Sequence, residues 1–497
     1  MWVRVLCALV VLAAFPASAE VDLRSVVREH TLQNGMKWLI VERPQAPVFS
    51  AYLRVRVGGA DEEPGYTGLA HLFEHIAFKG TPVIGATDFE AEKPLLAKMA
   101  EVGDQLAALK RAGKSDSEEA RALTGQLEAL EAEHAKVTDG NAFERLYQVN
   151  GAAGFNATTN KDLTSYFVSF PKNRLEVWAQ AEAQRFAAPV MRDFYKEIDV
   201  VREERRMRTD SSPSGALYEE LIQTAFTNSP YRWPTVGYHR DLEGMTLEKA
   251  LAFYKRFYVP ANAVGAIVGD VQFEEVVPLI ERTFGAIPAG PVPPQPEFTE
   301  PPRRQTRRST VWFDANPMLM IAFHKPTLPT RDDYVFDVIS TLLSHGRTSR
   351  LHRKLVLKVR LAQSIGTWGA PGARLDNLFV ISAAPMKGVT PEQVESAVLA
   401  ELERLKSEPV GERELQKVRN RIHADQARTM DSNSGLASSL SWAQAVAGDW
   451  RYRADHPKQI DSITPEEIQR VARTWFRPEN MTVVTLERPM KAAGGAR

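Results

Sequence analysis

The stretch TLEKALAFYKRFYVPANAVGAIVG, which begins at Thr246, returns in altered form as TPEEIQRVARTWFRPENMTVVTLE, which begins at Thr464. The two copies keep a threonine, an aromatic residue, a proline and an asparagine in the same register: Thr246 with Thr464, Tyr258 with Phe476, Pro260 with Pro478, and Asn262 with Asn480. Each copy is typical of an amphipathic helix that stops at a proline and is followed by a β-strand. Two copies are too few for a solenoid. The repeat therefore predicts two homologous domains.

The remainder of the chain favours an α+β fold built from two such domains. Its 497 residues exceed what one hydrophobic core usually holds. Strand-like stretches are separated by helical ones without regular parallel crossover units, which favours a mainly antiparallel sheet packed with helices in each domain. We expect the first domain to cover residues 20–286 and the second to cover residues 309–490. The proline-rich stretch 287–308 has the composition of a linker, and residues 491–497 are expected to be a disordered tail.

Local patterns define the beginning of the first domain. Asn34-Gly35 lies between two apolar runs and predicts a β-hairpin. In residues 53–57, LRVRV, apolar and arginine side chains alternate, which predicts a half-buried strand. A helix from about Thr67 to Phe78 is expected to follow.

Residues 91–137 resemble an insertion into the first domain. They are rich in Ala, Glu, Leu and Lys, with leucines at helical spacing on either side of a break at residues 113–117. This pattern predicts a helical hairpin. The simpler interpretation is a packed ornament on the domain surface, and the alternative is an arm that docks a partner.

Composition and the N-terminus limit where the chain acts. Lysine plus arginine (62) equals aspartate plus glutamate (62), which argues against a nucleic-acid-binding protein. Residues 1–19 combine a basic start, a short apolar run and the small-residue sequence Ala17-Ser18-Ala19, as a cleavable signal peptide does. Cleavage after Ala19 removes the one cysteine, Cys7, so a disulfide scaffold or a thiolate zinc cluster is excluded. We expect an exported protein without a membrane span, with the periplasm as its destination.

The segment GLAHLFEHIAF, residues 68–78, carries the chemistry. On a helix, His71 and His75 are four residues apart, so both imidazoles leave the same face and can bind one Zn²⁺. Glu74 is displaced around the helix, where it can act on a water at the metal without being a ligand. Two surface histidines on an ordinary helix would be the alternative. The pattern favours a catalytic metal site.

Two histidines need a third protein ligand, which must be His, Asp or Glu because no cysteine remains. The segment YKEIDVVREERRMR offers Glu197 and Glu204 on one helical face, with Val200 and Val201 expected on the packed side. Glu203 is one residue off that face. Glu176 and Glu182 are further candidates, and spacing alone does not choose among them. For most of these residues, a charged solvated helix is the simpler interpretation.

Three segments together resemble the pitrilysin/insulinase family of inverted-motif zinc peptidases, which includes mitochondrial processing peptidases. GADEEPGYTGLAHLFEHIAFKGT (59–81) is similar to its zinc motif, FNATTNKDLTSYF (155–167) to its substrate-side strand, and EIDVVREE (197–204) to its third-ligand helix. The resemblance implies one Zn²⁺ per chain and a zinc-dependent endopeptidase acting on peptides or unfolded protein segments. The roles it implies are as follows: His71, His75 and Glu204 are zinc ligands, Glu74 is the general base, Glu197 is a carboxylate orienting the site, and Asn156 and Ala157 lie on the edge strand that binds substrate.

The sequence departs from the family in its second half. The family normally has an arginine and, seven residues later, a tyrosine that contact substrate, but RLHRKLVLKVRLAQS (350–364) places Val356 and Gln363 there. Arg353 and Arg360 are close but out of register. We therefore expect the catalytic subunit of a heterodimer, whose partner is a similar chain that lacks the zinc motif and supplies the pair. The alternative is a non-proteolytic structural or assembly subunit that retains a zinc site.

Overall fold

The computed structural model describes residues 22–489; the predicted signal peptide and C-terminal tail lie outside this range. The first half contains six strands and the helices around them: α1 (Leu23–Val26), β1 (Arg28–Thr31), β2 (Lys37–Glu42), β3 (Val48–Val55), η1 (Gly59–Asp61), α2 (Leu69–Ile76), α3 (Phe89–Arg111), α4 (Glu118–His134), α5 (Ala142–Val149), β4 (Ala153–Thr159), β5 (Thr164–Pro171), η2 (Lys172–Arg174), α6 (Leu175–Ala187), α7 (Phe194–Arg205), η3 (Arg206–Asp210), α8 (Pro213–Ala225), η4 (Pro230–Arg232), α9 (His239–Glu243), α10 (Leu247–Phe257), η5 (Pro260–Asn262), β6 (Ala263–Gly269), α11 (Phe273–Thr283) and η6 (Phe284–Ala286). The second half contains five strands and their helices: β7 (Arg307–Trp312), β8 (Met318–Lys325), α12 (Arg331–Ser344), η7 (His352–Lys358), β9 (Ala362–Ala370), β10 (Asn377–Pro385), α13 (Pro391–Ser407), α14 (Glu412–Asp431), α15 (Asn433–Val446), α16 (Arg451–Asp461), α17 (Pro465–Trp475), η8 (Pro478–Asn480) and β11 (Met481–Glu487).

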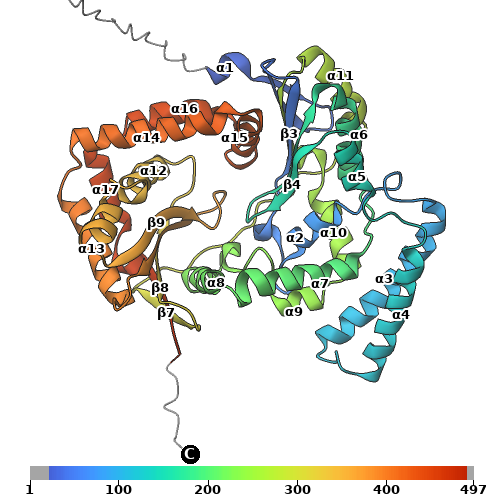
Figure 1. Cartoon of the computed structure of the whole chain (residues 1–497), viewed down its shortest axis with the longest axis horizontal. Coiled ribbons are helices and arrows are strands. Elements are labelled where there is room, and N and C mark those ends of the chain that lie inside the picture. Colours follow the sequence, from blue (N-terminus) through green and yellow to red (C-terminus); the bar gives the residue numbers. More distant parts are fainter. Residues whose placement is uncertain (1–21, 490–497) are drawn as a thin grey trace, which may run out of the picture.

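The two halves carry equivalent sheets, which confirms the predicted α+β class with two homologous domains (Figure 1). The first sheet has the strand order β1-β2-β6-β3-β5-β4, and the second has the order β7-β11-β8-β10-β9. Each sheet is antiparallel except for one parallel pair, β2 with β6 and β11 with β7. The β1–β2 hairpin forms at Asn34-Gly35 as predicted.

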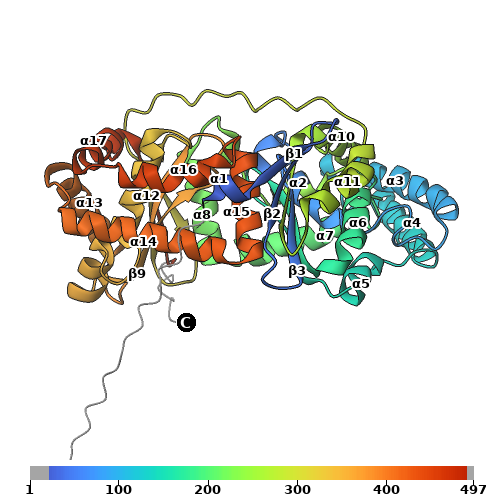
Figure 2. The same ribbon diagram turned by 90° about the horizontal axis from the view of Figure 1, so that it is seen from above.

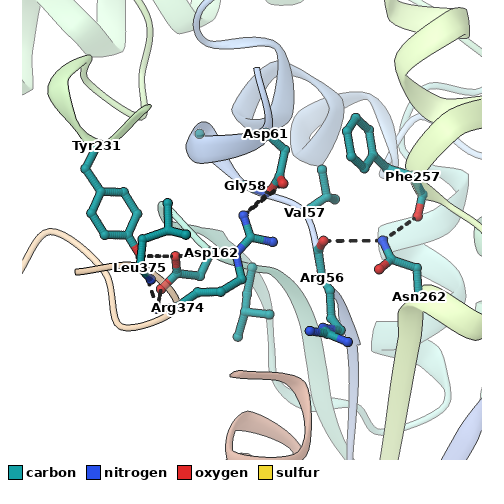
Figure 3. Close-up of polar contacts among 12 residues, drawn as sticks. Arg56, Val57, Gly58, Asp61, Asp162, Tyr231, Phe257, Asn262, Arg374 and Leu375 are labelled. Atoms are coloured by element: carbon teal, nitrogen blue, oxygen red, sulfur yellow. Dashed lines mark hydrogen bonds and ion pairs between the residues drawn. The ribbon is translucent and has the colours of Figure 1, made fainter. Parts of the chain in front are cut away.

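The sequence repeat forms the same helix, turn and strand in each half. Thr246 and Thr464 cap the N-termini of α10 and α17 through their hydroxyl groups. Asn262 donates its amide to the carbonyl groups of Phe257 and Arg56 (Figure 3), and Asn480 donates in the same way to Trp475 and His324. Each asparagine thus ties the end of a helix to a neighbouring strand, which gives a physical reason for its presence in both copies.

Each half also places one helix on the sheet of the other half. Helix α15 of the second half packs on β3 and β6, where Leu436 and Leu440 contact the first sheet. Helix α8 of the first half packs on β7, β8 and β11, where Leu217 and Leu221 contact the second sheet. A sheet with two apolar faces needs a cover on both sides, and here one of the covers comes from the other half.

Because of this cover, the prediction that residues 53–57 form a half-buried strand is wrong. Every residue of β3 except Val48 is buried. Arg54 faces α15, where it donates to the hydroxyl groups of Ser438 and Ser441 and to Ser165 of β5. The arginine that suggested a solvent-facing side of the strand is therefore an internal residue.

The predicted helical hairpin is formed by α3 and α4, which project from one end of the molecule (Figure 1). Residues 288–306 form no helix or strand and run along one side of the molecule from the first half to the second (Figure 2). Strand β7 begins at Arg307, inside the stretch predicted as linker, and Arg308 pairs with Glu395 of α13. Between residues 22 and 489, no helix is both long enough and apolar enough to cross a membrane.

Candidate metal centre

The position of helix α2 is fixed by the carboxylate of Glu62. This buried side chain accepts hydrogen bonds from the backbone N–H groups of Gly68 (2.9 Å) and Ala70 (2.8 Å), the first free donors of the helix. Gly68 itself has φ +92°, and a Cβ at this position would lie 2.7 Å from the carbonyl oxygen of Val236. Burial raises the pKa of Glu62, and the hydrogen bonds from Ala70 and Gly68 partly offset this shift. The start of α2, and hence the direction of its histidines, is set by buried contacts.

Three side chains converge beside α2. His71 and His75 project from α2, with ring centroids 4.9 Å apart, and Glu204 projects from α7. The Nε2 atom of His71 lies 3.6 Å from Glu204 Oε1, and the Nε2 atom of His75 lies 3.4 Å from Glu204 Oε2. One nitrogen or oxygen atom of each residue lies within 4.8 Å of the others.

This geometry suits a tetrahedral metal ion. Ligand atoms at about 2.0–2.1 Å from a tetrahedral Zn²⁺ are about 3.3 Å from one another, close to the two histidine–glutamate separations. Two imidazoles and one carboxylate form a known donor set for catalytic zinc, which keeps its fourth position open. Burial lowers the pKa of His71, which favours the neutral ring that a metal ligand requires.

Glu74 lies on α2 between the two histidines and is not one of the three converging residues. It is buried, and its Oε2 atom has no hydrogen-bond partner among residues 22–489. Burial raises the pKa of this carboxyl group, and the Thr159 hydroxyl partly offsets the shift. A buried carboxylate oxygen without a partner is costly unless it serves another purpose, such as accepting a proton.

Glu197 holds His75 from the other side. Its Oε2 atom lies 3.1 Å from His75 Nδ1, and its Oε1 atom lies 2.5 Å from Lys79 Nζ. Burial would raise the pKa of Glu197, but the contacts with His75 and Lys79 outweigh it and the net shift is downward. Burial likewise opposes the charged form of His75, yet Glu197 and Glu204 raise its pKa to about 9.

The other glutamates considered in the sequence lie elsewhere. Glu203 is exposed and pairs with Arg206, Glu176 pairs with Arg282 at the surface, and the buried Glu182 pairs with Arg185. The expectation for the packed side of α7 is half wrong: Val201 is buried, whereas Val200 is 48% exposed. The helix turns by about 100° per residue, so neighbouring valines do not share a face.

Lys79, Thr159 and Arg208 are the residues that sequence reasoning missed. Lys79 lies four residues after His75, and Arg208 lies four residues after Glu204, with its Nη1 atom 2.7 Å from Glu204 Oε1. The spacing of four was a usable signal for Arg208. Lys79 lies beyond the end of α2 at Ile76 and contacts Glu197 of α7. Thr159 comes from β4, and no local pattern connects it to α2.

Asn156 and Ala157 lie on β4, the edge strand of the first sheet, and pair with Phe167 and Tyr166 of β5. Ala157 is buried on the side of α2, while Asn156 is exposed and its side chain accepts from the N–H of Ala157. The outer edge of β4 has no neighbouring strand within residues 22–489.

In the second half, Val356 belongs to the short helix η7 and packs on the hydrophobic core. Gln363 is on the edge strand β9 and donates to the carbonyl group of Pro385. Arg353 and Arg360 form no salt bridge within the described range.

Two family models match the chain. "Insulinase (Peptidase family M16)" matches residues 37–95, which include α2, and "Peptidase M16 inactive domain" matches residues 244–422. Among curated proteins, "Zinc protease PqqE" of Helicobacter pylori is 26% identical over 479 residues, covering 94% of this chain and 95% of that protein. "Uncharacterized zinc protease ML0855" of Mycobacterium leprae is 24% identical and covers 89% of this chain and 87% of that protein.

Solved structures show the same fold. The crystal structure of a protease from Helicobacter pylori has a TM-score of 0.78 at 25% identity and covers 93% of this chain and 99% of that one. The periplasmic protease PqqL from Escherichia coli has a TM-score of 0.67 at 15% identity, covering 93% of this chain and 47% of that one. The matching models, the full-length relatives and the shared fold lead to one conclusion: the chain is a member of the pitrilysin/insulinase-type peptidase family M16.

Proposed function

We propose that this protein is a zinc-dependent endopeptidase that hydrolyses peptides or unfolded protein segments. His71, His75 and Glu204 hold one Zn²⁺ per chain, and the relatives named zinc proteases support this choice of metal. Zn²⁺ in this position supplies a Lewis acid that acidifies water and polarises a peptide carbonyl group.

Glu74 is the general base. The state of its carboxylate is the observation that carries the proposal. Its buried Oε2 atom lacks a partner in the described part of the chain and adjoins the converging ligands, where it can take a proton from the attacking water. The same carboxyl group then delivers the proton to the leaving amine. A purely structural zinc site needs no such group and usually fills all four positions with protein ligands.

Glu197 acts on the metal ligand and not on the substrate. By contacting His75 Nδ1 it holds the ring so that Nε2 faces Glu204. Carboxylates in this relation to a ligand histidine orient it and raise its basicity.

Substrate binds as an added strand along β4, beside Asn156 and Ala157. The free edge of β4 and the contact between β4 and α2 support this placement, because a peptide added there passes next to the ligands. Backbone hydrogen bonds would supply most of the affinity, so extended and unfolded segments are preferred over folded ones.

The protein works as the catalytic subunit of a heterodimer. Val356 is packed on the core and Gln363 is occupied by Pro385, so neither replaces the arginine and tyrosine of the family. A homologous subunit without the zinc motif supplies that pair. These same two residues favour the second candidate function, a structural or assembly subunit that retains zinc but not proteolysis.

Residues 1–19 direct export to the periplasm, where the structural relative PqqL is described as acting.

The test uses the purified mature chain with zinc analysis and a library of quenched fluorescent peptides. Glu74→Gln should keep zinc and abolish hydrolysis, whereas His71→Ala should lose zinc; Glu203→Gln, on an exposed residue of α7, is the matched control. Retained hydrolysis in Glu74→Gln contradicts the role of base. Zinc without any hydrolysis directs the work to co-purification of a partner, and full activity as a lone homodimer contradicts the heterodimer.

A further inference from the structure

The loop between β9 and β10 of the second half contacts the first half at η1, which precedes α2, and at the turn between β4 and β5. Its Arg374 is buried, with 6% of its side chain exposed, and its Nη2 atom lies 2.8 Å from both carboxylate oxygens of Asp61, itself 3% exposed (Figure 3). Asp162 is the next acid, with its Oδ1 atom 4.0 Å from Arg374 Nε. Arg374 Nε forms no hydrogen bond within residues 22–489, so the side chain pairs with Asp61 and only neighbours Asp162. A buried arginine that pairs with an aspartate from another part of the fold is a specific connection, not a surface pair.

The backbone of the same loop is also held. Asp162 accepts hydrogen bonds from the N–H groups of Ala373 (2.6 Å) and Arg374 (3.2 Å). The Tyr231 hydroxyl donates to Asp162 and accepts from the N–H groups of Arg374 and Leu375, both at 3.1 Å. Gly372 makes this approach possible, since a Cβ there would lie 2.4 Å from the Tyr231 oxygen. Specific hydrogen bonds and close packing therefore hold the backbone of this loop against Asp162 and Tyr231.

The two aspartates lie beside the two elements that flank the metal centre, helix α2 and the hairpin of β4 and β5. Asp61 directly precedes Glu62, whose carboxylate holds the first turn of α2. Asp162 lies in the turn that joins β4 to β5, the expected substrate-side hairpin. The segment of Asp61 and the turn of Asp162 are bonded to each other, because Gly59 N–H donates to Asn160 and Ala60 N–H donates to Lys161. Arg374 thus contacts both of these segments at the point where they join.

We propose that Arg374 is a positioning residue for the peptidase reaction: by clamping Asp61 and Asp162 together from the second half, it sets the relative position of helix α2 and strand β4. This inference rests on the proposed function. It assigns to the second half a role in the chemistry although all the candidate ligands belong to the first half. A peptide on β4 is aligned with Glu74 only when this clamp is closed, so the clamp acts on turnover more than on binding.

The experiment compares Arg374→Gln and Arg374→Lys in the full mature chain, together with any partner that wild-type activity requires. Arg24→Gln is the matched control, because Arg24 forms an exposed ion pair with Asp455 between the two halves, away from Asp61 and Asp162. We expect Arg374→Gln to lower kcat about 10- to 100-fold with little change in KM. Arg374→Lys keeps the charge but not the guanidinium group that extends from Asp61 toward Asp162, and it should recover part of the loss.

Hydrogen exchange provides the readout that is independent of activity. In Arg374→Gln, the amides of β4 and of Gly68 and Ala70 should exchange faster, while those of the α3–α4 hairpin should not change. If the variant fails to fold, Asp61→Asn, which keeps the shape and removes the charge, should show the same exchange pattern. Unchanged exchange in β4 and α2, or an equal loss in Arg24→Gln, overturns the inference. If the wild type shows no peptidase activity even with its partner, while Arg374→Gln still shows the expected faster exchange, the proposed function is contradicted and the role of Arg374 in positioning α2 and β4 stands.

Discussion

His75 and Glu197 are in contact at 3.1 Å through Nδ1 and Oε2, and the opposite nitrogen of the same ring faces Glu204 at 3.4 Å. The imidazole of His75 therefore lies between two glutamates. Glu197 orients the ring, and Glu204 is the expected ligand of the same metal ion. Both glutamates come from α7, seven residues apart, so two turns of one helix grip a histidine of another. This arrangement gives Glu197 a role that can be separated from that of Glu204.

Replacing Glu197 by Gln should weaken metal binding without abolishing it. The amide cannot hold His75 Nδ1 and Lys79 as a carboxylate does, and such losses typically lower metal affinity about 10- to 100-fold. Titration with a competing zinc chelator measures this change. Glu203→Gln, on the exposed side of α7, should retain wild-type affinity, and an equal loss there would contradict the assignment.

The helical hairpin is anchored by a buried ion pair, and removing the acid should destabilise the protein. Glu92 of α3 is fully buried, with its Oε1 atom 2.6 Å from Arg192 Nε and 2.8 Å from His134 Nε2. Glu92→Ala leaves the arginine buried without its partner, which costs about 3–5 kcal/mol of unfolding free energy. Chemical denaturation measures it, with Glu90→Ala, on the same helix and 80% exposed, as the control. A loss below 1 kcal/mol would show that the hairpin is held in another way.

Each half places a helix on the sheet of the other half, which predicts that a cavity in one core destabilises both halves. Leu221 of α8 is fully buried in the cluster shared with the second sheet. Leu221→Ala should lower the unfolding free energy by about 2–5 kcal/mol, and hydrogen exchange should rise in β3 and in β10 together. Val83→Ala, at a residue 75% exposed, should have no effect. Faster exchange confined to one half would contradict the coupling.

His324 should make stability depend on pH. Burial lowers its pKa to about 3, and its Nε2 atom contacts the carbonyl oxygen of Ala225 at 3.1 Å. Below pH 6.5 the unfolded chain takes up a proton at this histidine while the folded chain does not, so stability is lost as the pH falls from 6.5 toward 3. Compared with His324→Gln, the wild type should lose about 1.4 kcal/mol between pH 7.5 and pH 5.5. Parallel unfolding curves at the two pH values test this, and an equal loss in both proteins would contradict it.

The parts of the site that sequence could predict are those that depend on helical spacing. His71, Glu74 and His75 lie within one short helix, so their relative directions follow from its periodicity. The choice between Glu203 and Glu204 depended on the rotation of α7 about its axis. That rotation is set by what buries Ile198 and Val201, which is information from the tertiary structure.

The fold was predictable from the repeat, but the contacts between its halves were not. Arg54 reads as a surface residue because its cover, α15, lies 387 residues later at Ser441. Similarly, nothing local marks Arg374 as a partner of Asp61, since the two are 313 residues apart. The alternation of apolar and polar residues indicates whether a segment is a helix or a strand. Whether its second face is buried depends on elements that lie far away in the sequence.

The crossed helices have a consequence for how the chain is made. The first sheet is complete in sequence once β6 ends at Gly269, but α15, which covers its outer face, ends about 180 residues later. At about 5–20 residues per second, a ribosome needs on the order of 10–35 seconds to synthesise that stretch. During this interval the side chains of β2 and β6 on that face, Leu39, Val41, Ala266 and Val268, have no permanent cover. The nascent chain must therefore be shielded by a chaperone or kept unfolded until its last third has been translated.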